Sequence, residues 1–264
     1  GTASDAGHVR VYKYNGTTWT QLGADIDGEA AGDESGTSVS LSSDGKTVAI
    51  GAYANDGTGD AAGHVRVYSW SGSAWTKLGG DIDGEAADDS SGYSVSLSSD
   101  GTTLAVGAIY NDGTASNAGH VRVYSWSGSA WNQLGGDIDG EAADDRSGFS
   151  VSLSSDGTTL AVGAYGNVGN GTDSGHVRVY SWSGSAWNQL GDDIDGEAAG
   201  DYSGGSVSLS SDGATLHVGA FGNGGTASNA GHVRVYTWDG SAWTQRGDDI
   251  DGEAAGDYSG GSVS

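Results

Sequence analysis

The sequence predicts an all-β fold, a β-propeller of four-stranded antiparallel blades. The tetrapeptide Gly-His-Val-Arg begins at Gly7, Gly63, Gly119, Gly175 and Gly231, so the chain repeats every 56 residues. Each copy contains four short segments of strand character, and no apolar 3.6-residue pattern persists for three turns. A fixed period near this length is typical of repeat architectures, in which every copy has nearly the same surroundings.

The first two strands of a blade are predicted from the copy that begins at Gly63. Residues 94–98 alternate small polar with apolar side chains, the pattern of a half-buried strand. The Asp100-Gly101 pair then favours a tight hairpin turn. Residues 104–108 form a nearly continuous apolar run, which predicts an inner strand covered on both faces.

The third and fourth strands follow a polar loop. Residues 120–124 alternate again, with Val121 and Val123 on one face. A Ser-Gly turn leads to the fourth strand at 130–134, and the acidic segment 137–141 is expected to be a loop to the next unit. A stacked β-solenoid is the competing architecture, but its coils are usually shorter and run parallel, so four antiparallel strands favour the propeller.

The whole chain, residues 1–264, is predicted to form one propeller domain with units starting near 7, 63, 119, 175 and 231. Five complete units would need 5 × 56 = 280 residues, and the chain has 264, so the first and last blade should be split and incomplete. That blade would combine 262–264 with 9–19 and lack a second strand. The strand edge exposed there would invite pairing with another molecule, so a filament is one hypothesis.

The composition excludes several classes of partner. The chain has 10 Lys and Arg against 35 Asp and Glu, a net charge of −25, which disfavours nucleic acid and anionic membrane surfaces. No apolar run is long enough for membrane insertion. The 50 glycines follow no Gly-X-Y period, which excludes collagen and suits many short strands joined by turns.

The segment from Ser147-Gly148-Phe149 to Gly163-Ala164 resembles the FG-GAP repeat of integrin-α-like propellers. The match recurs at 91–108 and 35–52. The whole unit is similar to secreted FG-GAP-like repeats of marine bacteria and algae, in which a Trp strand leads into an Asp-Ile-Asp-Gly-Glu-Ala-Ala segment. The resemblance covers the full chain and implies a propeller in an extracellular or cell-surface protein.

Two departures from the FG-GAP pattern limit what the resemblance implies. The proline of the GAP motif is absent, because Tyr53, Ile109, Tyr165 and Phe221 follow Gly-Ala instead. Integrin-type repeats also carry a calcium loop between their first two strands, where this chain has only a tight Ser-Asp-Gly turn. The calcium ligands of that family therefore have no counterparts here.

The acidic segment between units is a separate candidate for calcium, the one cofactor considered. Its alternating carboxylates could supply several of the six to eight oxygens that calcium prefers, although it lacks the length of an EF-hand loop. The candidate ligands are Asp25, Asp27, Glu29, Asp81, Asp83, Glu85, Asp137, Asp139, Glu141, Asp193, Asp195 and Glu197. The alternative is a structural connector whose carboxylates accept backbone N–H groups and pair with Arg10, Arg66, Arg122, Arg178 or Arg234.

Three further residue sets have a structural and a functional interpretation. The repeated His8, His64, His120, His176 and His232 lie on separate blades and are expected to be hydrogen-bonded structural residues rather than a metal ring. The aromatic set represented by Tyr68, Trp70 and Trp75 could stack on sugars but more often fills gaps between blades. Asn15 and Asn170 begin N-glycosylation sequons.

The function predicted from these features is a non-enzymatic extracellular module, either structural (a surface layer, appendage or filament) or adhesive, acting through protein partners or self-association. An active site needs several different groups at one point, whereas this chain repeats one set of groups. Two alternatives stay open: a lectin-like propeller that binds glycans, and a calcium-stabilised scaffold domain of a larger secreted protein.

Overall fold

The computed structural model describes residues 3–264 and contains only strands and turns in that range. Four five-stranded sheets and two two-stranded sheets follow one another along the chain, and every pair of named strands is antiparallel. The all-β expectation is therefore confirmed. Within the described range no helix is long and apolar enough to cross a membrane.

One blade illustrates the sheet order. Strands β10 (Ser91–Leu97), β11 (Thr103–Ala108), β12 (His120–Trp126) and β13 (Trp131–Gln133) are neighbours in that order. The segment 137–141, expected to be a loop, contains the short strand β14 (Ile138–Asp139), which also pairs with β12. Strands β13 and β14 thus share the outer edge of the blade, because each pairs with a different half of β12.

The other three complete blades have the same order. Their strands are β5 (Ser38–Leu41), β6 (Thr47–Ala52), β7 (His64–Trp70), β8 (Trp75–Lys77) and β9 (Ile82–Asp83); β15 (Ser150–Leu153), β16 (Thr159–Ala164), β17 (His176–Trp182), β18 (Trp187–Gln189) and β19 (Ile194–Asp195); and β20 (Ser203–Leu209), β21 (Thr215–Ala220), β22 (His232–Trp238), β23 (Trp243–Gln245) and β24 (Ile250–Asp251).

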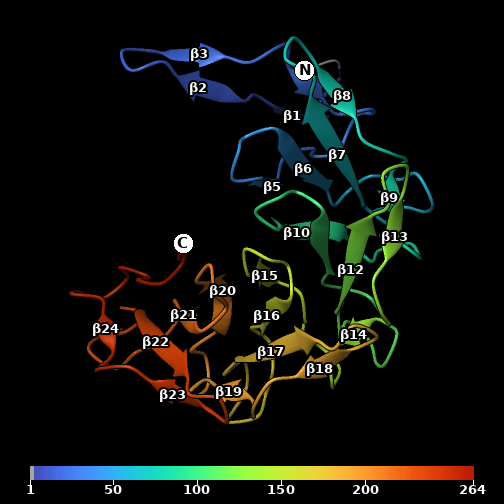
Figure 1. Cartoon of the computed structure of the whole chain (residues 1–264). Coiled ribbons are helices and arrows are strands. Elements are labelled where there is room, and N and C mark those ends of the chain that lie inside the picture. Colours follow the sequence, from blue (N-terminus) through green and yellow to red (C-terminus); the bar gives the residue numbers. More distant parts are fainter. Residues whose placement is uncertain (1–2) are drawn as a thin grey trace.

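The N-terminal sheets correspond to the outer half of a blade. They comprise β1 (His8–Val9) paired with β4 (Ile26–Asp27), and β2 (Tyr12–Tyr14) paired with β3 (Trp19–Gln21). Residues 262–264 form no strand, so they do not join the N-terminal strands in one sheet. Figure 1 shows the blades arranged as an open arc, with the N-terminal strands at one end and β20–β24 at the other.

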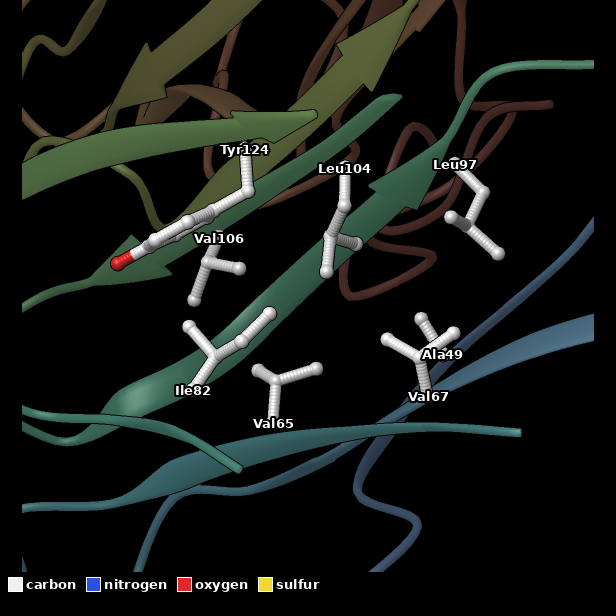
Figure 2. Close-up of a cluster of buried hydrophobic side chains, with 8 residues drawn as sticks. All are labelled: Ala49, Val65, Val67, Ile82, Leu97, Leu104, Val106 and Tyr124. Atoms are coloured by element: carbon white, nitrogen blue, oxygen red, sulfur yellow. The ribbon is translucent and has the colours of Figure 1, made fainter. Parts of the chain in front are cut away.

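The hydrophobic core lies between blades rather than within a single sheet. Figure 2 shows Val65, Val67 and Ile82 of one blade facing Leu104 and Val106 of the next. Equivalent clusters join the second blade to the third and the third to the fourth. The alternating Val residues on the third strand of one blade form one side of each cluster. The apolar second strand of the next blade forms the other side, and this strand is covered on both of its faces.

A glycine in each second strand allows neighbouring blades to approach closely. A Cβ atom added to Gly107 would lie 2.1 Å from the carbonyl oxygen of Gly148 in the next blade. The hydroxyl of Ser94 donates a hydrogen bond of 2.6 Å to the same oxygen. The glycine of the Leu-Ala-Val-Gly-Ala segment is therefore required because the backbone of the adjacent blade leaves no room for a Cβ atom.

Candidate functional site

Charged side chains form a repeated cluster at each boundary between units. The guanidinium of Arg178 lies 3.3 Å from the carboxylate of Glu141, which belongs to the preceding unit, and donates a 2.8 Å hydrogen bond to the backbone oxygen of Asp139. The pairs Arg66–Glu29, Arg122–Glu85 and Arg234–Glu197 repeat this ion pair in the other blades. The predicted pairing of the acidic segment with the repeated arginines is confirmed at its Glu position.

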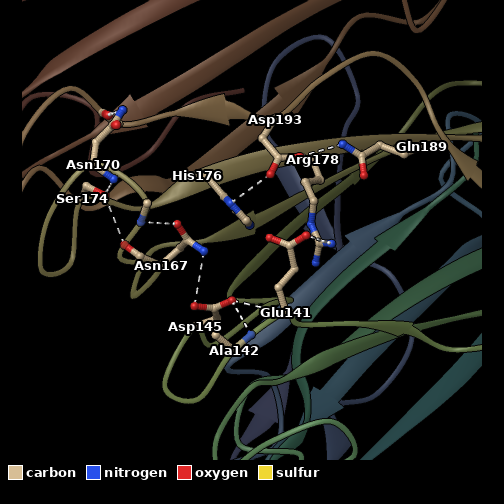
Figure 3. Close-up of polar contacts among 12 residues, drawn as sticks. Glu141, Ala142, Asp145, Asn167, Asn170, Ser174, His176, Arg178, Gln189 and Asp193 are labelled. Atoms are coloured by element: carbon tan, nitrogen blue, oxygen red, sulfur yellow. Dashed lines mark hydrogen bonds and ion pairs between the residues drawn. The ribbon is translucent and has the colours of Figure 1, made fainter.

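A buried aspartate fixes the backbone beside each Glu. Asp145 is fully buried, and one of its carboxylate oxygens accepts hydrogen bonds from the backbone N–H groups of Glu141 (3.2 Å) and Ala142 (3.0 Å). Its other oxygen accepts a 3.3 Å bond from the amide of Asn167 (Figure 3). The position of the Glu side chain is therefore set by a buried hydrogen-bonded turn.

Four of the five repeated histidines lie in these same clusters. The imidazole of His176 is buried, and its Nδ1 lies 3.8 Å from the carboxylate of Asp193 (Figure 3). Donor atoms of Glu141, His176 and Asp193 all lie within 4.8 Å of one another, a grouping that could hold a metal ion. The same grouping recurs as Glu29–His64–Asp81, Glu85–His120–Asp137 and Glu197–His232–Asp249. Each histidine thus meets two carboxylates rather than other histidines.

Burial favours the neutral form of three of these imidazoles. Desolvation, assisted by the neighbouring guanidinium of Arg122, lowers the pKa of His120 to about 4. The same causes lower the pKa of His64 and of His176. At neutral pH each of these three rings therefore offers lone-pair electrons at one nitrogen.

The structure divides the twelve candidate calcium ligands into two groups. Those within the clusters are Glu29, Asp81, Glu85, Asp137, Glu141, Asp193 and Glu197. Asp25, Asp27, Asp83, Asp139 and Asp195 lie outside them. Asp25 instead accepts hydrogen bonds from the Nε and Nη2 atoms of Arg10, and this contact lowers the pKa of Asp25 to about 2. Neighbouring carboxylates of one segment are therefore separated, whereas carboxylates of successive segments are brought together. Calcium binding stays a prediction.

The outer-strand aromatic residues pack as pairs at the blade boundaries. The rings of Trp126 and Trp131 lie 5.4 Å apart, and the indole N–H of Trp131 donates a 2.9 Å hydrogen bond to the backbone oxygen of Leu78 in the preceding blade. The other blades repeat this bond through Trp75, Trp187 and Trp243. The gap-filling interpretation of these tryptophans therefore agrees with the geometry.

A second aromatic group, which the sequence did not single out as a site, crosses the blades. This aromatic row consists of Tyr53, Tyr93, Phe149, Tyr165, Tyr202 and Phe221, joined by ring contacts with centroid distances of 4.3–5.9 Å. The rings lie where the first strand of each blade begins and the second ends, at one edge of the sheets, as the pairing of Ser91 with Ala108 shows. All six are partly exposed, so they form a continuous apolar surface.

Polar groups flank this aromatic row. The guanidinium of Arg146 lies 5.2 Å from the ring centroid of Tyr165 and donates a hydrogen bond to its hydroxyl group. At the other end, the hydroxyl of Tyr53 donates a 2.7 Å hydrogen bond to Glu34, which raises the pKa of Tyr53 to about 12. The surface therefore combines stacked rings with one cation and one anion.

The aromatic row coincides with the positions at which the repeats differ most. The copies beginning at Gly63, Gly119 and Gly175 carry three different residues at only four positions. These are Ser90/Arg146/Tyr202, Tyr93/Phe149/Gly205, Ile109/Tyr165/Phe221 and Asp112/Val168/Gly224. The first three positions supply five of the six rings and Arg146. A comparison of the copies for their differences, rather than their likeness, would have found this surface from the sequence.

The two candidate glycosylation residues differ in their surroundings. Asn15 lies in an exposed turn, where its amide group donates a 3.1 Å hydrogen bond to Thr18. The amide of Asn170 donates a 2.9 Å bond to the backbone oxygen of Gly196, in the place where Thr58, Thr114 and Thr226 bond in other copies. Both residues are exposed and each amide group donates a hydrogen bond, and modification of either stays a prediction.

Comparisons with known proteins agree with the propeller architecture. The family model described as FG-GAP repeat matches residues 82–124 and 138–180. The search of curated proteins gives no match to the chain.

Three solved structures share the fold at low sequence identity. The periplasmic gluconolactonase PpgL of Pseudomonas aeruginosa is 18% identical over 94% of this chain and 65% of its own, with a TM-score of 0.60. Hydrazine synthase of Kuenenia stuttgartiensis is 16% identical over 81% of this chain and 48% of its own, with a TM-score of 0.53.

The third is KlAtg21 in complex with the coiled coil of AgAtg16, 13% identical over 81% of this chain and 57% of its own, with a TM-score of 0.54. The chain spans about half to two thirds of the length of these structures. Together with the blades described above, they show that this is a β-propeller, of which residues 82–124 and 138–180 match the FG-GAP repeat.

Proposed function

We propose that this propeller is a non-enzymatic extracellular adhesion module that binds a protein partner through the aromatic row. The observation that carries the proposal is the concentration of differences between nearly identical copies on one continuous aromatic surface. Variation there makes the surface different from blade to blade, so it presents one distinct site rather than a site repeated in every blade. Support for an extracellular location comes from the FG-GAP match, because such repeats are typical of extracellular proteins.

The residues of the surface suit binding better than catalysis. Large, partly exposed aromatic side chains are enriched at the centres of protein interfaces, where they supply most of the binding free energy. Arg146 adds a cation whose guanidinium already lies over the ring of Tyr165. The phenylalanine rings supply neither a nucleophile nor a general base, and the row as a whole offers contact area and orientation.

The same rings support a second candidate, a lectin-like site. Sugars stack on aromatic faces, and the row offers several adjacent rings, among them Tyr202 and Phe221, which are stacked with an interplanar angle of 9°. The net charge of −25 disfavours acidic glycans for this candidate and leaves neutral ones.

The test is binding of labelled protein to an array that carries both extracellular matrix proteins and neutral glycans. We expect saturable binding to protein spots, reduced about tenfold or more by the combined substitution Phe149→Ser and Tyr165→Ser. Trp19→Ser is the matched control, because Trp19 is an exposed aromatic residue (69%) outside the row. Thermal melting of each variant separates a loss of binding from a loss of folding.

The outcomes separate the candidates. Binding confined to glycan spots, with the same sensitivity to the row variant, favours the lectin-like function. Equal loss in the Trp19→Ser control, or no binding to either class of spot, contradicts the assignment of the aromatic row as the adhesive surface.

A further inference from the structure

The inter-blade clusters bring together nitrogen and oxygen donors from two units. Each contains one Glu, one His and one Asp with donor atoms within 4.8 Å of one another, and there are four such clusters in the described residues. In the third cluster the Glu141 carboxylate precedes the blade that carries His176 and Asp193. The three donors therefore come from three separate segments, and the same spacing recurs through the chain.

The histidine in each cluster has no hydrogen bond that would explain its burial. His176 is only 1% exposed, and its Nδ1 faces Asp193 at 3.8 Å, beyond hydrogen-bond length. Its Nε2, like that of His64, has no hydrogen-bond partner within residues 3–264. The imidazole of His176 thus meets the carboxylates of Glu141 and Asp193 without a hydrogen bond to either, although buried polar side chains are nearly always hydrogen-bonded, and Nδ1 is the nitrogen that faces Asp193.

The local charge favours a divalent cation. The carboxylates of Glu141 and Asp193 and the guanidinium of Arg178 meet in the cluster around His176, so carboxylates outnumber cations there. A divalent ion would offset this excess of negative charge. Arg178 contacts Glu141 through one carboxylate oxygen, so the other oxygen is available to a metal.

We propose that each inter-blade cluster binds one zinc-class divalent ion through the imidazole of its His and the carboxylates of its Glu and Asp. Zinc binds imidazole nitrogen and carboxylate oxygen at about 2.0–2.2 Å, which places ligand atoms about 3.3 Å apart in a tetrahedral site. Small side-chain rotations bring donors that already lie within 4.8 Å to that separation. A water molecule is the fourth ligand.

The donor set discriminates between metals. Calcium prefers six to eight oxygen ligands, whereas imidazole suits zinc and its transition-metal neighbours. These sites also differ from the calcium segments expected from the sequence, because the Glu and the Asp come from successive units. Each bound ion would join the end of one unit to the next blade, beside the tryptophan hydrogen bond that already spans this boundary.

The chain contains its own control. His8 and Asp25 occupy the equivalent positions in the N-terminal half-blade, but His8 is exposed and forms no such grouping with Asp25 and a Glu within residues 3–264. Arg10 there pairs with Asp25 instead of with a Glu of a preceding unit. The stoichiometry expected from the described clusters is therefore four ions per chain rather than five.

The test is titration of chelator-treated protein with zinc, followed by calorimetry and by metal analysis after gel filtration. We expect four zinc ions per chain and a higher melting temperature, with calcium giving neither at the same concentration. Cobalt provides an independent readout, because tetrahedral coordination produces visible absorption bands.

Variants assign the ligands. His120→Gln should lower the stoichiometry from four to three and the cobalt absorption by about a quarter, as should Glu85→Gln, which leaves the buried core intact. His8→Gln should change neither. A stoichiometry that is equally altered by His8→Gln and His120→Gln, that is unchanged by Glu85→Gln, or that never saturates would overturn the proposal.

Discussion

Replacement of Trp131 by phenylalanine measures what one blade boundary contributes to stability. The indole N–H of Trp131 donates a 2.9 Å hydrogen bond to the backbone oxygen of Leu78 in the preceding blade. Phenylalanine keeps an aromatic ring against Trp126 but loses this donor and part of the contact with the inter-blade core. The lost hydrogen bond costs about 0.5–1.5 kcal/mol, and the smaller ring raises the expected total to about 1–2 kcal/mol.

The assay is thermal and urea unfolding of the purified chain. For a protein of this size each kcal/mol corresponds to about 2–4 °C in melting temperature. Trp19→Phe is the matched control: Trp19 packs on Tyr14 at a centroid distance of 5.4 Å, and it is 69% exposed. The control should change stability by about 0.5 kcal/mol or less. Equal destabilisation by the two substitutions would refute the assignment of the tryptophan hydrogen bond as an inter-blade contact.

Two further predictions concern the strands and the histidines. Gly107→Ala should lower the free energy of unfolding by about 3 kcal/mol or more, because its Cβ would lie 2.1 Å from the carbonyl oxygen of Gly148. A Cβ added to Gly136 meets no atom within 4 Å, so the control Gly136→Ala should leave the free energy of unfolding in urea nearly unchanged. In chelator, stability should fall as the pH is lowered from about 6.5 to about 4, because the unfolded state protonates His120 before the folded state does. His120→Gln should flatten this pH dependence, and an unchanged slope of urea midpoint against pH would contradict the burial of a neutral imidazole.

The fold could be predicted from the sequence because the repeat removed most of the ambiguity. Each predicted strand occurs several times along the chain with nearly the same sequence. The recurrence shows that the alternating pattern at 120–124 and the apolar run at 104–108 are not chance patterns. Both strands were confirmed, with small shifts of their ends. The short strand at Ile138 was missed because two residues carry no periodicity, and its pairing is fixed only by the edge of β12.

The candidate sites were harder to predict because they depend on contacts between units. The carboxylates of one acidic segment alternate in sequence, but strand pairing at Ile82 and Ile138 buries the isoleucines and separates the flanking aspartates. The ion-pair partner of each Glu is an arginine 37 residues later, as in Glu85 and Arg122, a sequence separation that no local motif encodes. The aromatic row was not predicted from the sequence, because each copy of the repeat contributes only one or two of its rings.

The boundary between one blade and the next has the same hydrogen bonds wherever it occurs, such as the tryptophan bond that spans 53 residues and the serine bond that spans 54. Any blade can therefore follow any other without a new interface having to evolve. Unequal recombination between copies, which adds or deletes one 56-residue period, would leave every junction chemically intact. The gene can thus change in length by whole modules, while substitutions at a few positions along the aromatic row change only the surface that we propose binds a partner.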